Sequence, residues 1–135
     1  MQDVRVPATD GYPLAASVYP PPGERSGLVV INSAAAVPRR FYRHFAEALT
    51  QAGYLVVTYD YRGIGESRPP SMKGFEARMR DWAEKDMAAV IDWALAEHGP
   101  GPLILVGHSF GGQVPGLLPQ GERVAAMLTF SSQSG

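Results

Sequence analysis

The segment 103-LILVGHSFGG-112 joins a short run of branched apolar residues to a serine that lies between glycines. It contains the pattern Gly-x-Ser-x-Gly, which is typical of a sharp turn between a strand and a helix. Such a turn holds the serine hydroxyl out where a substrate can reach it, so Ser109 is a candidate nucleophile. A serine hydroxyl attacks weakly unless a base takes its proton. The alternative is a glycine-rich turn in which Ser109 only caps the following helix.

On both sides of this segment, short apolar runs alternate with amphipathic stretches. We expect strands at 4–9, 14–19, 28–32, 55–59, 103–106 and 125–130, and helices at 39–52, 81–98 and 111–118. Asp10-Gly11 predicts a hairpin between the first two strands. The run 28-LVVIN-32 is typical of a strand that is buried on both faces. This order predicts an α/β fold with a mostly parallel sheet of about six strands and an antiparallel N-terminal hairpin.

The composition is that of an ordinary globular protein and predicts a single domain over residues 1–135. Hydrophobic residues make up 45% of the chain and charged residues 19%, with a formal net charge of -1. Without a charge block we expect neither a nucleic acid nor a membrane as partner. No apolar run reaches the length of a membrane span, and the N-terminus lacks the apolar stretch of a secretory signal. The chain has no cysteine, which excludes thiolate metal sites. We expect a cytoplasmic protein.

Three motifs in register with this pattern resemble the α/β-hydrolase family. The first is the elbow, which we define as residues 107–112. The second, 60-DYRGIGES-67, resembles the D-x-R-G-x-G-x-S loop that follows the fourth strand of that family. The third is the small-residue loop 32-NSAAAVP-38, where the family places an oxyanion-hole loop. The chain resembles most a bacterial group in which Ala-x-Gly-Val-Pro replaces the usual His-Gly, and it covers about the N-terminal half of such an enzyme.

The resemblance implies a three-layer fold and a division of roles at the active site. Ser109 would attack an acyl carbonyl, and two backbone N–H groups would hold the oxyanion that develops. One donor would be the N–H of Phe110. The other would be the N–H of Ala35, with Ala34 and Ala36 as close alternatives. A tight turn without a catalytic role is the other interpretation of this loop.

The remaining residues of the elbow have a steric role in this interpretation. Gly107, Gly111 and Gly112 would relieve clashes between the strand and the helix, because the turn strains its central residue. His108 supports the elbow as the residue that precedes the serine.

The second motif is expected to be a structural loop. Asp60 would accept hydrogen bonds from backbone donors in the turn at Gly63 and Gly65, and Arg62 would pair with a carboxylate. Gly63-Ile64-Gly65 is also half of a dinucleotide fingerprint. Arg68 stands where the third glycine is required, so we expect no nucleotide cofactor. We expect no metal and no other cofactor.

The base and the acid of a catalytic triad are missing after Ser109. In this fold the triad runs Ser, then Asp or Glu, then His along the chain. Residues 110–135 contain no His and no Asp, and their one acid, Glu122, precedes the last strand, at the wrong edge of the sheet. His98 is expected at that same edge, and His108 is expected to point away from the serine. His44 is therefore the remaining native candidate for the base.

We therefore expect part of a serine hydrolase of the esterase or acyl-hydrolase type, truncated after the sixth strand and inactive alone. Its substrate would be a small-molecule ester or acyl compound. The strand 125–130 would be a bare sheet edge, which predicts a homo-oligomer or a second chain that covers it. The alternative function is a non-catalytic module that self-associates or binds a partner. A third possibility joins the two, in that a second copy or a second polypeptide supplies the missing residues.

Overall fold

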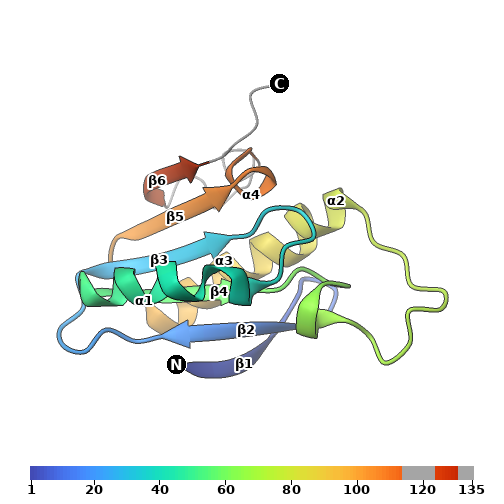
Figure 1. Ribbon diagram of the computed structural model, residues 1–135, viewed down its shortest axis with the longest axis horizontal. Helices are drawn as coiled ribbons and strands as arrows, with labels where there is room; N and C mark the ends of the chain where they lie inside the picture. The colour runs from blue at the N-terminus through green and yellow to red at the C-terminus, as the bar shows by residue number, and fades with distance from the viewer. Residues whose placement is uncertain (114–123, 131–135) are drawn as a thin grey trace.

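The computed structural model describes residues 1–113 and 124–130. In this part of the chain, the strands form one sheet with helices around it (Figure 1). The strands are β1 (Gln2–Pro7), β2 (Pro13–Tyr19), β3 (Gly27–Asn32), β4 (Tyr54–Tyr59), β5 (Leu103–His108) and β6 (Val124–Phe130). The helical elements are η1 (Arg39–Tyr42), α1 (Arg43–Gln51), η2 (Gly65–Ser67), α2 (Met79–Asp81), η3 (Trp82–Met87), α3 (Ala88–His98) and α4 (Phe110–Gln113).

The strand order in the sheet is β1-β2-β4-β3-β5-β6. β2 runs antiparallel to β1 and to β4, whereas β3 is parallel to β4 and β5, and β5 is parallel to β6. Parallel neighbours bring the carboxyl ends of β3, β4 and β5 to one edge, where ligands bind in open α/β sheets. The predicted fold class is confirmed.

The sheet divides the hydrophobic core into two clusters, with α1 on one face and α3 on the other (Figure 1). Ala46 of α1 packs with Ile31 and Val106 on the first face. The second cluster joins α3 to the central strands through Val30, Val57, Leu105, Val90, Ile91 and Ala94. Because both faces are covered, all six residues of β3 are buried, as the run without polar alternation predicts.

Several helices and strands begin or end at other residues than predicted, at places where the backbone hydrogen bonds follow a different pattern. The hairpin strands stop at Pro7 and resume at Pro13, so Asp10-Gly11 lies inside a longer connection. Beyond Pro7, the N–H of Thr9 donates to the carbonyl of Lys85 in η3 and leaves the ladder. The predicted helix 39–52 begins as a 3₁₀ turn, and the predicted helix 81–98 starts earlier and includes the π-helical turn η3. Of the predicted helix 111–118, residues 114–118 lie outside the described part of the chain.

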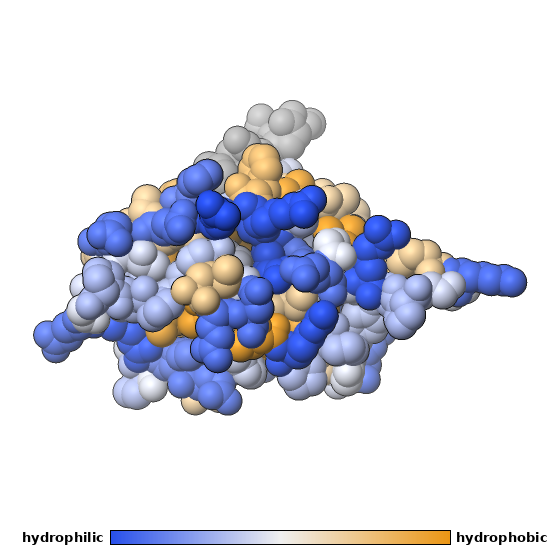
Figure 2. Space-filling view, turned by 60° about the horizontal axis from the view of Figure 1, so that its bottom comes forward, coloured by the Kyte–Doolittle hydropathy of each residue, from blue (hydrophilic) through white to orange (hydrophobic). Residues whose placement is uncertain are grey.

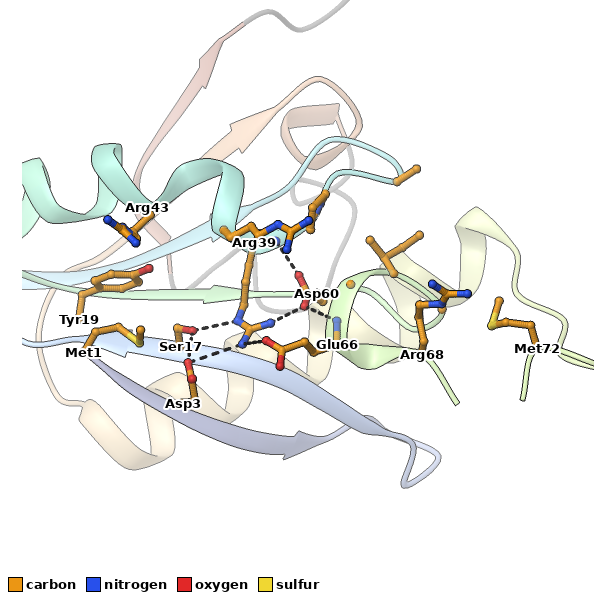
Figure 3. Close-up of a pocket in the computed structure, with 16 residues that line it drawn as sticks. Met1, Asp3, Ser17, Tyr19, Arg39, Arg43, Asp60, Glu66, Arg68 and Met72 are labelled. Atoms are coloured by element: carbon orange, nitrogen blue, oxygen red, sulfur yellow. Dashed lines mark hydrogen bonds and ion pairs between the residues drawn. The ribbon is translucent and has the colours of Figure 1, made fainter. Parts of the chain in front are cut away.

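Asp60 joins the end of β4 to the beginning of η1 (Figure 3). Its carboxylate, which is 1% exposed, accepts the backbone N–H of Arg39 at 2.6 Å, the N–H of Glu66 at 3.0 Å and the Arg39 guanidinium. Gly65 packs directly on this carboxylate, with a φ of 53°. A Cβ on Gly65 would lie 2.6 Å from Asp60 Oδ2. The glycine is therefore required both by the left-handed backbone and by the close approach.

Arg62 makes a second charged connection, between the hairpin, the loop after β4 and η3. Its guanidinium lies 2.8 Å from carboxylate oxygens of both Asp10 and Asp86. The hydrogen bonds from Arg62 hold the pKa of Asp10 well below its usual range. Burial instead raises the pKa of Asp86, and the Arg62 contacts oppose this shift. Two buried guanidinium groups, those of Arg39 and Arg62, thus hold the 60–67 loop in place. Each of them pairs with different carboxylates.

Replacing Asp60 by Asn tests the first of these connections. Asp60→Asn keeps the size of the side chain and leaves the nearly buried Arg39 guanidinium without its main counter-charge, so we expect the free energy of unfolding to fall by about 3 kcal/mol. Urea denaturation measures this. The matched control is Glu66→Gln, at a side chain that is 69% exposed, which should cost less than about 1 kcal/mol. Equal losses in the two variants would contradict the assignment.

Candidate active site

The elbow connects β5 to α4 through one residue with an unusual backbone. Ser109 lies between His108, the last residue of β5, and Phe110, the first residue of α4, and its φ is 55°. The left-handed region costs a residue with a Cβ about 1–2 kcal/mol, so this conformation is held by its surroundings. Gly112 N–H closes the turn on the Ser109 carbonyl at 2.9 Å. The serine is half-buried, with its backbone reversed between strand and helix.

Two glycines of the elbow are explained by contacts between backbones. A Cβ on Gly107 would lie 2.3 Å from the Cα of Gly112, so the strand and the first turn of α4 touch. A Cβ on Gly111 would lie 2.1 Å from the carbonyl oxygen of Asn32, at the end of β3. No side chain fits at either distance. The elbow is therefore pressed against the beginning of the loop that follows β3.

That loop, residues 33–38, contains a turn with a second residue in the left-handed region. Val37 N–H donates to the carbonyl of Ala34 at 3.1 Å, and Ala36 between them has a φ of 63°. Ala34 N–H donates to the hydroxyl of Tyr42 at 2.9 Å, so this amide is occupied. Ala35 N–H makes no hydrogen bond within the described residues. The structure thus occupies the amide of Ala34, one of the two alternatives to Ala35 that the sequence leaves open.

Three rings that the sequence does not predict to be in contact stand beside the elbow. The Tyr42 hydroxyl lies 2.8 Å from His108 Nδ1. Phe41 stacks on the His108 ring at a centroid distance of 6.2 Å and an interplanar angle of 10°. Burial raises the pKa of Tyr42, so its hydroxyl keeps its proton at ordinary pH. Helical spacing marks Phe41 as an apolar position but carries no signal that Tyr42 and His108 meet.

A family model described as "alpha/beta hydrolase fold" matches residues 28–132. The match covers the elbow, the 60–67 loop and the loop after β3. The chain belongs to the α/β-hydrolase family. A monoacylglycerol lipase from Mycolicibacterium smegmatis is 31% identical over 106 residues, which are 77% of this chain and 36% of that protein.

Solved structures agree with this assignment of the fold. A thermostable carboxyl esterase from Bacillus coagulans matches with a TM-score of 0.79 at 18% identity, over 95% of this chain and 43% of that one. The bottromycin epimerase BotH matches with a TM-score of 0.71 at 27% identity, over 99% of this chain and 50% of that one. The chain thus spans half or less of the length of each of these proteins.

The other histidines of this α/β-hydrolase chain make contacts within their own helices. His44 is 91% exposed at its side chain and lies 3.6 Å from Glu47 on α1. His98 makes an edge contact with Trp93 of α3, and burial lowers its pKa. Glu122 lies outside the described residues. Within the described part of the chain, neither His44 nor His98 contacts the elbow.

A cavity of about 680 Å³ opens next to the loop after β3 (Figure 3). Arg39 is one of its lining residues. The Arg39 guanidinium donates hydrogen bonds to Asp60, Glu66 and Ser17. Ala36 lines the cavity, whereas Ser109 does not. Its buried charges are already paired with each other, so we assign it no part in the hydrolase site.

Two further findings concern the surface and metal ions. On the face seen in Figure 2, hydrophilic side chains predominate and apolar ones form small areas between them. No helix in the described ranges is both long and apolar enough to cross a membrane. Residues 1–113 and 124–130 contain no group of three or more acidic or histidine side chains placed to hold a metal ion.

Ala36 occupies the glycine position of the Ala-x-Gly-Val-Pro pattern, which leads to a stability prediction. Ala36→Gly relieves the left-handed strain but adds entropy to the unfolded chain, for a net gain of about 0.5 kcal/mol in the free energy of unfolding. Urea or thermal denaturation measures the change. The matched control is Ala35→Gly, at a position without a positive φ, which should lower stability. A loss of similar size in both variants would contradict the strain assignment.

Proposed function

We propose that this chain carries the nucleophile and the oxyanion-binding half of a serine hydrolase that acts on small-molecule esters or acyl compounds. The observation that supports this best is the backbone of Ser109, which has a φ of 55° between β5 and α4. Such a turn keeps a serine hydroxyl exposed while the amide of the next residue faces the same space. Phe110 N–H is then the first oxyanion donor, and Ala35 N–H is the second.

In the proposed reaction, Ser109 Oγ attacks the carbonyl carbon of the ester and a base takes its proton. The carbonyl oxygen becomes an oxyanion, which the N–H groups of Phe110 and Ala35 stabilise. Each of these donors lowers the activation free energy by several kcal/mol at most. When the tetrahedral intermediate collapses, the alcohol leaves with a proton and the acyl group stays on Ser109. Water then hydrolyses the acyl-enzyme and restores the free serine.

The base and its orienting acid would come from residues outside this sequence or from a second chain. Residues 110–135 hold no His and no Asp, although the family places both after the serine. The matched part of this chain covers 36% of the Mycolicibacterium lipase and 43% of the Bacillus esterase. We therefore propose that the chain alone turns over esters slowly or not at all.

The ester or acyl class is supported by the relatives' names, a lipase and a carboxyl esterase. The epimerase among the structural neighbours is a reminder that one fold hosts several activities. We therefore base the proposed activity on the geometry of the elbow, and the experiment that tests it has to measure oxyanion stabilisation directly.

A cysteine at position 109 tests the proposal without the missing base. The chain has no cysteine, so Ser109→Cys introduces a single thiol, which ionises near pH 8.5 without help. At pH 9 we expect acylation by p-nitrophenyl acetate, followed by mass spectrometry of the thioester. Alkylation by iodoacetamide, which forms no oxyanion, corrects for thiol reactivity and access. We expect the ratio of acylation to alkylation to exceed that of the exposed control Ser71→Cys by at least about tenfold.

Equal ratios at positions 109 and 71 would overturn the proposed site. A raised ratio at 109 supports the nucleophile position and the oxyanion donors together. In the native chain, p-nitrophenyl acetate turnover no greater than in Ser109→Ala would agree with a base supplied from elsewhere.

A second proposed function, self-association, is favoured by the sheet edge at β6. Among the described strands, β6 pairs only with β5, so no described strand pairs with the N–H and C=O groups of its other edge. Two apolar side chains of the strand are exposed, Met127 at 36% and Leu128 at 57%. A second copy of the chain that pairs through β6 would cover both the edge and these side chains.

Substitution of Leu128 tests this pairing. Leu128→Lys places a charge on the edge strand, which disfavours edge-to-edge pairing, so we expect a dimer dissociation constant at least about tenfold higher by sedimentation velocity. Met72→Lys is the matched control, because Met72 is 42% exposed and lies in a loop far from β6 in sequence. A chain that stays monomeric at high concentration, or an equal effect of both substitutions, would count against self-association through β6.

A further inference from the structure

We propose that Tyr42 is the positioning residue of the oxyanion site, because one hydroxyl group joins the loop after β3 to the elbow. This inference rests on the proposed function. The hydroxyl is 2.9 Å from the N–H of Ala34 and 2.8 Å from His108 Nδ1. Ala34 precedes one proposed oxyanion donor, Ala35, and His108 precedes the nucleophile. The two halves of the site therefore meet at a single oxygen atom.

The direction of one hydrogen bond at this oxygen follows from the groups involved. A tyrosine hydroxyl has one proton to donate and can accept further hydrogen bonds. Ala34 N–H can only donate, so the hydroxyl oxygen accepts from it. The same hydroxyl group also hydrogen-bonds to His108 Nδ1.

Tyr42 itself is held rigidly, as a positioning group has to be. It is 2% exposed and packs in the core cluster between α1 and the sheet with Ile31, Ala46 and Val106. Phe41 makes an edge contact with the Tyr42 ring at 5.1 Å and also stacks on the ring of His108. Because this packing fixes the Tyr42 hydroxyl, the hydroxyl can hold the loop of residues 33–38 in position.

The position of Ala34 determines the direction of the next amide. The Ala34 carbonyl also accepts from Val37 N–H, and the turn between them contains the strained Ala36. With Ala34 N–H anchored on Tyr42, the loop has little freedom to rotate the peptide group of Ala35. A donor displaced by about 1 Å can cost a large part of its effect on the rate. The Tyr42 hydroxyl thus acts on the reaction through Ala35, without contact to the substrate.

The test removes the hydroxyl in the Ser109→Cys background. Tyr42→Phe combined with Ser109→Cys should lower the ratio of p-nitrophenyl acetate acylation to iodoacetamide alkylation at least about fivefold. Hydrogen exchange of the Ala34 amide should become at least about tenfold faster. The ¹⁵N shift of His108 Nδ1 should change, because the nitrogen loses its hydrogen bond with the Tyr42 hydroxyl. Tyr19→Phe is the matched control, since Tyr19 lies in the same core cluster but belongs to β2, away from the loop and the elbow.

Three outcomes separate this inference from the proposed function. Equal ratios for Ser109→Cys and Ser71→Cys overturn the proposed function before Tyr42 is considered. A high ratio in Ser109→Cys that Tyr42→Phe leaves unchanged, with Ala34 exchange also unchanged, overturns the positioning role alone. If Tyr42→Phe lowers the unfolding temperature too far for these measurements, His108→Phe replaces it. That variant keeps a ring for stacking on Phe41 but removes the ring nitrogen that meets the Tyr42 hydroxyl, and an unchanged ratio there overturns the inference as well.

Discussion

The structure depends on a contact between backbones, in which the first turn of α4 is pressed against the ends of β3 and β5. Gly111 approaches the carbonyl of Asn32, and Gly107 approaches Gly112, at distances that leave no room for a side chain. This contact reverses the chain at Ser109 and places the loop after β3 beside the elbow. Fold and site therefore share one cause, because the closely packed strand-turn-helix unit also sets the backbone of Ser109.

Charge pairs hold the remaining loops in place around that unit. Asp60 receives donors from η1 and η2, and Arg62 is shared between Asp10 and Asp86. Removing one partner from such a buried pair costs more than the pair contributes, since the other charge stays in the protein interior. The 60–67 loop thus orders the edge of the sheet that faces the site, while the chemistry is left to other residues.

The sequence predicted the regular parts of this chain because they follow from local patterns. The uninterrupted apolar run of β3 predicted a strand covered on both faces, and the serine between glycines predicted the elbow. Other features depend on hydrogen bonds between distant segments. Thr9 leaves the hairpin because its N–H finds Lys85 in η3, and no pattern near Thr9 contains that information.

At the site, the sequence by itself determined the family, the position of Ser109 and the absence of His and Asp after it, because these depend on residue type and order. It left three neighbouring alanines as alternatives for one oxyanion donor, since residues of equal size in a loop cannot be told apart by composition. The tertiary structure shows that one of these amides, that of Ala34, donates to the Tyr42 hydroxyl. Eight positions separate Tyr42 from Ala34 and sixty-six separate it from His108, so only the packing of η1 on the sheet brings the three together.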